Sequence, residues 1–108
     1  MGQLLNALEN LGIADNTMFV FTSDNGGHPE FALNVPLRES KWNLYEGRMR
    51  VPMIVRWPKL VEKGTTYVTP TIGMDFMPTF REMVGIASGS EMALDGMSIL
   101  PVLKDANL

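Results

Sequence analysis

Apolar side chains recur at helical spacing in two stretches of the chain. In the first, polar residues separate four leucines: Leu4, Leu5, Leu8 and Leu11. In the second, five side chains fall on one helical face: Phe76, Met77, Phe80, Met83 and Val84. These spacings predict helices over residues 2–11 and 75–84, each with one buried stripe. Gly12 and Gly85 follow as helix ends, and Asp75 is placed to cap the start of the second helix.

Short, continuous apolar runs predict β-strands over residues 17–22 and 51–57. The absence of polar alternation is typical of strands buried on both faces, as in a parallel sheet. The sequence predicts a short edge strand over residues 65–70. Over residues 94–103 the sequence predicts a turn followed by an apolar segment, which fits a helix or a strand equally well.

Between the two predicted strands, residues 26–50 have no clean period and contain several Gly and Pro residues. Unstructured connections longer than roughly 12–15 residues are uncommon in compact domains and often carry function. We therefore expect a functional loop here and predict that it is the most mobile part of the chain. The 108 residues are enough for one small domain, so we expect a single domain over residues 1–108.

Composition and charge exclude several classes of function. A hydrophobic fraction of 45% and a charged fraction of 19% are typical of a globular protein. The net charge of -3 does not favour nucleic acid as a partner, and no apolar run approaches the ~20 residues of a membrane helix. Cysteine is absent, which excludes disulfides and thiol nucleophiles and leaves the compartment open.

Candidate chemistry begins directly after the first predicted strand, at the turn from Ser23 to Gly27. Ligands bind at the carboxyl ends of strands in open α/β sheets. The carboxylate of Asp24 and the amide oxygen of Asn25 suit a hard cation such as Ca²⁺ or Mg²⁺. For a lone motif, however, a turn that only reverses the chain is the more common explanation.

Two further polar residues complete the candidate site. Lys41 offers a point positive charge for an anionic group, although a solvated surface lysine has the same spacing. His28, the single histidine, follows the turn and is a possible substrate contact, although a lone loop histidine is more often a surface group.

The order of these segments resembles the second half of the type I sulfatase (arylsulfatase-like) domain. The resemblance rests on "ADNTMFVFTSDNGG", "PLRESKWNLYEGRMRVPMIVRWP", "GMDFMPTFREMVGI" and "LDGMSILPVL". It implies an α/β fold, namely part of an alkaline-phosphatase-like sheet with flanking helices. It also implies hydrolysis of sulfate esters with one divalent cation, usually Ca²⁺ and possibly Mg²⁺. We expect the chain itself to be soluble, and members of this family are often periplasmic, secreted or lysosomal.

The resemblance also implies roles for individual residues. Asp24 and Asn25 match two metal ligands of the family, and Lys41 matches the lysine that binds the sulfate group. Tyr45 and Glu46 are interpreted as residues that shape the loop, with Glu46 bonded to backbone or to Arg50. The sequence departs from the family at Glu39-Ser40, where a pair of small residues is usual, and at Arg48, where a second glycine is usual.

The 108 residues lack the family's nucleophile, a formylglycine made from Cys or Ser in a C/S-x-P-S-R motif, and its pair of consecutive aspartates. We therefore expect an incomplete site that binds Ca²⁺ weakly or not at all and that is inactive when this chain is alone. One alternative is a non-enzymatic, self-associating module, since the chain is expected to form a homo-oligomer. Another is a relative of the phosphonate or phosphate monoester hydrolases.

Overall fold

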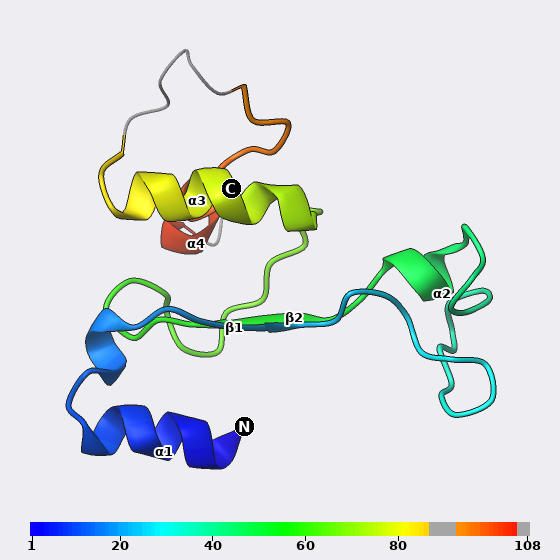
Figure 1. Cartoon of the computed structure of the whole chain (residues 1–108), viewed down its shortest axis with the longest axis horizontal. Helices are drawn as coiled ribbons and strands as arrows, with labels where there is room; N and C mark the ends of the chain where they lie inside the picture. The colour runs from blue at the N-terminus through cyan, green and yellow to red at the C-terminus, as the bar shows by residue number, and fades with distance from the viewer. Residues whose placement is uncertain (87–92, 106–108) are drawn as a thin grey trace. The chain divides into compact units, whose positions relative to one another are not determined.

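The computed structural model describes residues 1–86 and 93–105, and the chain divides into two compact units. Unit 1 spans Met1–Trp57 and unit 2 spans Pro58–Leu108. Figure 1 shows the elements of unit 1, which are α1 (Gly2–Asn10), η1 (Ala14–Asn16), β1 (Phe19–Thr22), α2 (Glu46–Met49) and β2 (Met53–Arg56). It also shows those of unit 2, which are η2 (Gly73–Asp75), α3 (Phe76–Met83) and α4 (Leu100–Lys104).

The two predicted helices are confirmed as α1 and α3, and both end as the sequence predicts. After α1, Gly12 has a φ of 67°, its N–H donates to Glu9 O (3.0 Å) and the Ile13 N–H donates to Leu8 O (3.1 Å). After α3, Gly85 has a φ of 74°. Its N–H donates to Glu82 O (3.0 Å), and the Ile86 N–H donates to Arg81 O (2.9 Å). Each pair satisfies carbonyls that a helix end leaves without partners, at a backbone conformation that glycine adopts without strain.

Strands β1 and β2 pair antiparallel, with Phe19 opposite Arg56 and Thr22 opposite Met53. The comparison of these strands with those of a parallel sheet was wrong for this pair, because continuous apolarity does not determine strand direction. Parallel neighbours need a crossover connection, whereas the segment between β1 and β2 returns the chain directly along β1. The expected burial on both faces is also wrong for this chain, since Phe21 and Ile54 are exposed.

The remaining sequence predictions have mixed outcomes. Residues 65–70 form no strand in the structure, although the segment is rich in β-branched residues. The apolar segment near the C-terminus is the short helix α4, and the short helix α2 was not anticipated inside the loop. Among the described residues, no helix is long and apolar enough to cross a membrane.

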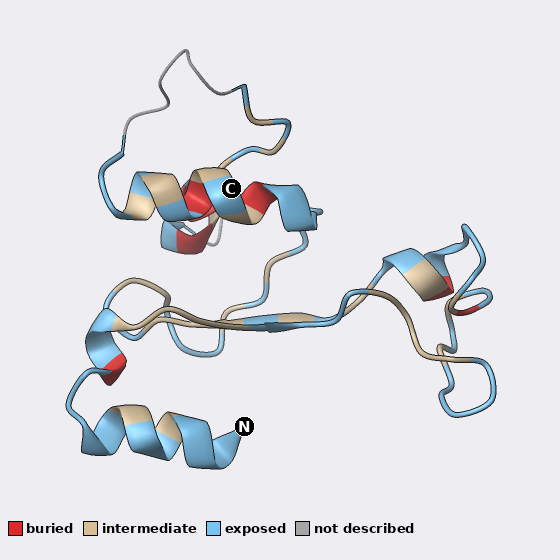
Figure 2. Ribbon diagram, viewed as in Figure 1, coloured by how far each residue is buried: buried red, intermediate tan, exposed pale blue. Residues whose placement is uncertain are grey.

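Only a few of the described residues are buried (Figure 2). Among the described residues of unit 2, the buried apolar side chains are Ile99, Leu100 and Leu103, which bring α4 against α3. In unit 1 the described residues contain one buried apolar side chain, that of Ala14. The leucines of α1 are at most half-buried, so the buried stripe expected for this helix is only partly covered in this chain.

A polar pair organises unit 2. The carboxylate of Asp75 accepts hydrogen bonds from the backbone N–H of Ile72 (2.8 Å) and of Met97 (2.9 Å). The Thr79 side chain is fully buried, and its hydroxyl donates to Asp75 O (2.6 Å) and accepts from the Ile99 N–H (3.0 Å). The Asp75 carboxylate therefore bonds the backbone just ahead of η2 and ties the segment before α4 to α3. It makes no capping hydrogen bond at the start of α3, so the expected cap was wrong.

Candidate functional site

The turn after β1 presents the two predicted metal ligands side by side. The Asn25 amide nitrogen donates to the Asp24 carboxylate (2.5 Å), and the Ser23 hydroxyl donates to Asn25 O (2.8 Å). Asp24 is exposed and Asn25 is half-buried. Because the contact between the side chains uses the amide nitrogen, the Asn25 amide oxygen remains an acceptor beside the carboxylate. The turn therefore offers oxygen ligands at one place.

Backbone hydrogen bonds join this turn to the segment that carries Lys41. The Lys41 N–H donates to Gly27 O (3.1 Å), and the Gly26 N–H donates to Arg48 O (2.7 Å). Two distant parts of the loop therefore meet the residues that directly follow Asn25. The structure brings Asp24, Asn25 and the Lys41 backbone into one loop cluster.

Asn34 is a structural residue of this cluster that the sequence interpretation missed. Its amide oxygen accepts from the Gly27 N–H (3.0 Å), and its amide nitrogen donates to Gly27 O and to Glu39 O (both 3.3 Å). Asn34 therefore holds together the two backbone segments that the Lys41 N–H bond joins, at Gly27 and at Glu39. No signal in the sequence distinguishes Asn34 from other polar loop residues.

Two glycines allow the backbones in this cluster to approach closely. A Cβ atom at Gly26 would overlap the carbonyl oxygen of Gly47. A Cβ atom at Gly47 would overlap the carbonyl oxygen of Glu39. Any larger residue at either position would push the segments apart, so these glycines are required for the loop to close on the turn.

The departures from the family's glycine pattern have different consequences. Glu39 adopts a φ of 65°, in the left-handed region that favours glycine. Its carboxylate accepts a hydrogen bond from the Asn43 amide (3.0 Å). Arg48 lies within helix α2, where the backbone needs no positive φ. Only the departure at Glu39 therefore places a side chain in a conformation that glycine adopts more easily.

Tyr45 and Glu46 shape the loop, as predicted. The Arg38 guanidinium lies over the Tyr45 ring, 4.1 Å from its centroid, and Arg50 donates to the Glu46 carboxylate (3.4 Å).

His28 lies among aromatic rings: its ring centroid is 4.7 Å from that of Trp42 and 5.1 Å from that of Phe31. His28 Nδ1 also accepts a hydrogen bond from the Glu30 N–H (3.2 Å).

The donors present fit part of a Ca²⁺ site. Ca²⁺ takes about 6–8 oxygen ligands, and Asp24 with Asn25 supplies side-chain oxygens of the right chemistry from adjacent positions. In the part of the chain that the structure describes, no group of three or more His, Cys, Asp or Glu residues is arranged to hold a metal ion. The turn can therefore contribute ligands but does not enclose a cation.

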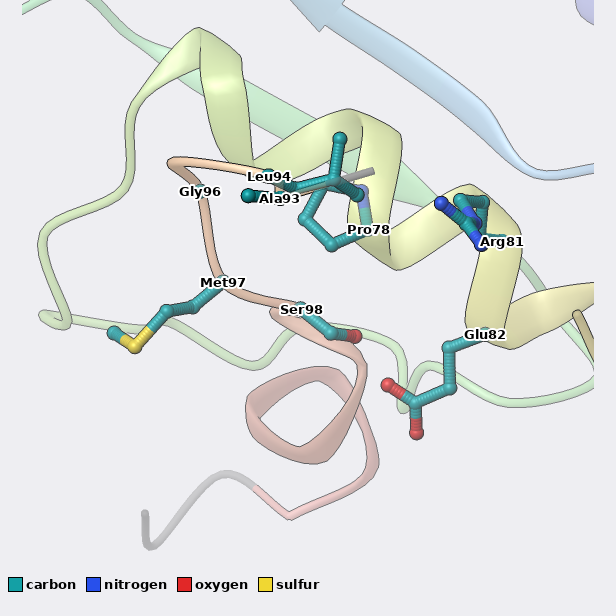
Figure 3. A pocket seen from close by; sticks show the side chains of 8 residues that line it. All are labelled: Pro78, Arg81, Glu82, Ala93, Leu94, Gly96, Met97 and Ser98. Carbon is teal, nitrogen blue, oxygen red and sulfur yellow. The ribbon is translucent and has the colours of Figure 1, made fainter. Parts of the chain in front are cut away.

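A pocket of about 410 Å³ lies elsewhere, in unit 2 (Figure 3). It is lined by residues of α3 and of the segment before α4: Pro78, Arg81, Glu82, Ala93, Leu94, Gly96, Met97 and Ser98. None of the predicted site residues contributes to it. The loop cluster after β1 therefore remains the candidate site, because it and not the pocket combines oxygen ligands with a lysine.

Comparison with known proteins identifies the family of the chain. The family model described as Sulfatase matches residues 1–86. Steryl-sulfatase of Homo sapiens is 34% identical over 113 residues, which cover 96% of this chain and 19% of the human protein. A sulfatase of Formosa agariphila is 39% identical over 116 residues, which cover 97% of this chain and 21% of that protein. The chain thus spans about a fifth of the length of these curated relatives.

Solved structures give the same result. The crystal structure of Ps i-CgsB in complex with k-i-k-neocarrahexaose matches with a TM-score of 0.88 and 39% identity, over 94% of this chain and 23% of that one. A structure determined in complex with its substrate, D-glucosamine-2-N,6-O-disulfate, matches with a TM-score of 0.76 and 35% identity, over 96% of this chain and 20% of that one. The α/β fold is therefore the alkaline-phosphatase-like fold, and the chain belongs to the sulfatase family.

Proposed function

We propose that this chain supplies the cation-binding and sulfate-binding part of a site that hydrolyses sulfate esters. In this proposal, Asp24 and Asn25 are two ligands of a Ca²⁺ ion, with Mg²⁺ as a possible substitute. Lys41 binds the sulfate group. The remaining metal ligands and the nucleophile are not among these 108 residues, so they must come from outside them.

The observation that carries the proposal is the hydrogen bond from the Lys41 N–H to Gly27 O. It ties the residue that would bind the anion to the turn that would bind the cation. Sulfate is an anion, and its transfer spreads negative charge over the sulfuryl oxygens and the leaving oxygen. A cation and an ammonium group held at one place would stabilise that charge.

The names of the relatives support the class of substrate. Similar proteins include steryl-sulfatases and an N-acetylglucosamine-6-O-sulfatase of Bacteroides thetaiotaomicron. Their common feature is a sulfate ester, and we propose that class for the site to which this chain contributes. The same comparisons favour a sulfatase over a phosphonate or phosphate monoester hydrolase.

We expect the isolated chain to have no turnover, because it contains no cysteine and no Ser in an S-x-P-S-R motif. It should also bind Ca²⁺ with a dissociation constant of about 1 mM or weaker, since few of the usual 6–8 oxygens are present. We expect 4-nitrophenyl sulfate to be hydrolysed at the uncatalysed rate in the presence of the chain and Ca²⁺. Turnover that disappears in Asp24→Ala would contradict this part of the proposal.

Binding is tested by NMR titration of the ¹⁵N-labelled chain with CaCl₂ and, separately, with sodium methyl sulfate. We expect Ca²⁺ to shift the amide signals of Asp24 to Gly27 and methyl sulfate to shift those around Lys41. Asp24→Ala should remove the first response and Lys41→Met the second.

Matched controls separate site binding from general charge effects. Asp15→Ala removes an acidic residue of η1, and Lys63→Met removes an exposed lysine of unit 2. Both variants should respond like the unmodified chain. Equal loss of binding in a site variant and in its control would contradict the proposal, because the response would then report net charge alone.

A further inference from the structure

Trp42 directly follows Lys41 and has two properties that rarely occur together. Its side chain is 68% exposed, and its backbone has a φ of 80°. A bulky residue in the left-handed region is a conformational outlier, and such strain concentrates at ligand-binding sites. Trp42 is the third residue of a turn that the Asn43 N–H closes onto Ser40 O (3.3 Å), a position with positive φ that favours glycine or asparagine over a bulky side chain.

Trp42 belongs to an aromatic cluster with His28 and Phe31. His28 meets the Trp42 ring edge-on, with an interplanar angle of 80°, and lies tilted against the Phe31 ring at 32°. The Phe31 side chain is 83% exposed. The His28 ring thus lies against both exposed rings, and it supports Trp42 through a favourable edge-to-face contact.

Backbone contacts connect the aromatic cluster to the proposed sulfate site. The Lys41 N–H donates to Gly27 O, and Gly27 and Lys41 are the sequence neighbours of His28 and Trp42, respectively. A cationic group and exposed ring faces therefore lie on one loop cluster. A sulfate ester of a cyclic alcohol has the complementary parts: an anionic sulfate group and an apolar ring face.

We infer that the aromatic cluster binds the ring of the sulfate ester's leaving group, with Trp42 as the principal contact. The occupant is a ring face, either of an aryl group or of a sugar. The inference rests on the proposed function, because Lys41 holds the sulfate end beside the cluster. Trp42 thereby favours cyclic over acyclic sulfate esters.

The test compares three ligands on the ¹⁵N-labelled chain by NMR: phenyl sulfate, glucose 6-sulfate and methyl sulfate. We expect at least one of the cyclic esters to bind about three- to tenfold more tightly than methyl sulfate, as for one aromatic contact. The indole N–H signal of Trp42, assigned with Trp42→Asn, should shift with that ligand. Preference for phenyl sulfate identifies an aryl site, and preference for glucose 6-sulfate identifies a sugar site.

The variants are chosen to keep the loop folded. Asparagine tolerates positive φ, so Trp42→Asn removes the ring without adding strain, while Trp42→Phe keeps a ring. We expect Trp42→Asn to remove the preference for the cyclic ester while leaving methyl sulfate binding unchanged, and Trp42→Phe to retain most of the preference. Trp57→Phe, at the other tryptophan of the chain, should retain all of it.

Failure of the inference differs from failure of the proposed function. Equal binding of all three esters, or a preference that survives in Trp42→Asn, would overturn the inference while leaving Lys41-dependent sulfate binding intact. Trp42-dependent binding of a cyclic ester whose affinity Lys41→Met does not lower would support the aromatic site and overturn the role of Lys41. Absence of binding by any ester would overturn both.

Discussion

Single residues without large side chains determine how the loop between β1 and β2 closes. Gly26 and Gly47 permit backbone contacts that no larger residue allows. The Asn34 side-chain amide bonds both the N–H and the carbonyl of Gly27. Together they position Lys41 beside the turn that carries Asp24. The chemistry of the candidate site therefore depends on residues that have no chemical role.

At Gly26, substitution by alanine should separate the turn from helix α2. The added Cβ would overlap Gly47 O and disturb the bond from the Gly26 N–H to Arg48 O. We expect a loss of about 1–3 kcal/mol in the stability of the closed loop, typical of overpacking, measured by hydrogen exchange at the Lys41 amide. Gly2→Ala is the control, because a Cβ there meets nothing within 4 Å. Unchanged protection in Gly26→Ala would contradict the predicted overlap.

In unit 2, Thr79→Val tests the buried hydroxyl without changing the size of the side chain. Valine removes the acceptor for the Ile99 N–H, which then lacks a partner in a buried position. We expect a decrease of about 1–3 kcal/mol in the free energy of unfolding, measured by urea denaturation. Thr66→Val, at an exposed position, should change stability by about 0.5 kcal/mol or less. A similar small change in Thr79→Val would show that the hydroxyl is dispensable.

At the scale of elements, sequence patterns located the long helices and the two strands, but they did not predict the direction in which the strands pair. The periodicity of residues 2–11 and 75–84 and the glycines after them carry local information, so α1 and α3 were predicted closely. Strand direction and the absence of a strand at 65–70 depend on tertiary partners. Helix α2 has four residues, too few for a periodic pattern.

The candidate site shows the same division between local and tertiary information. Asp24 and Asn25 were predicted because a polar turn directly follows an apolar run, and Lys41 because of its resemblance to a sulfatase motif. Their closeness depends on Asn34, Gly26 and Gly47, which are far apart in sequence. The aromatic contacts of His28 depend on the same folding of the loop, so a lone histidine in the sequence did not reveal them.

The greater mobility of residues 26–50 stays a prediction, and Asn34 provides a way to test it. Several apolar side chains of the loop are exposed, including Phe31, Leu33 and Val35, so few packing contacts hold it. We expect lower ¹⁵N order parameters in this loop than in β1, and a further decrease in Asn34→Ala. Asn6→Ala on the exposed face of α1 is the control. Values for the loop equal to those of β1 would contradict the prediction.

At the scale of the whole molecule, little apolar surface is fully buried for a chain with a 45% hydrophobic fraction. Within the described residues the sheet has two strands, so each strand has a neighbour on one side only. Exposed apolar side chains of the sheet include Phe21 and Ile54, which face each other in the register. Free strand edges and apolar surface of this kind favour association with another chain.

We therefore predict that the isolated chain forms homo-oligomers at micromolar concentration. Because association stabilises the folded chain, the melting temperature should rise with protein concentration. Sedimentation measures the assembly directly, and Ile54→Lys should weaken it by placing charges on the exposed sheet face. Lys substitution at the exposed Thr66 of unit 2 is the control. A well-folded monomer with a concentration-independent melting temperature would contradict the prediction.

The central claim is that the Asp24–Asn25 turn and Lys41 form one binding site for a cation and a sulfate group. If they do, Ca²⁺ and the sulfate ester bind to neighbouring positions and each increases the affinity for the other. The most direct measurement is the dissociation constant of methyl sulfate, determined by NMR with and without excess Ca²⁺ at matched ionic strength. The account predicts about fivefold tighter binding with Ca²⁺, at the low end of typical couplings, and no such increase in Asp24→Ala. An affinity for methyl sulfate that Ca²⁺ does not change would contradict the account.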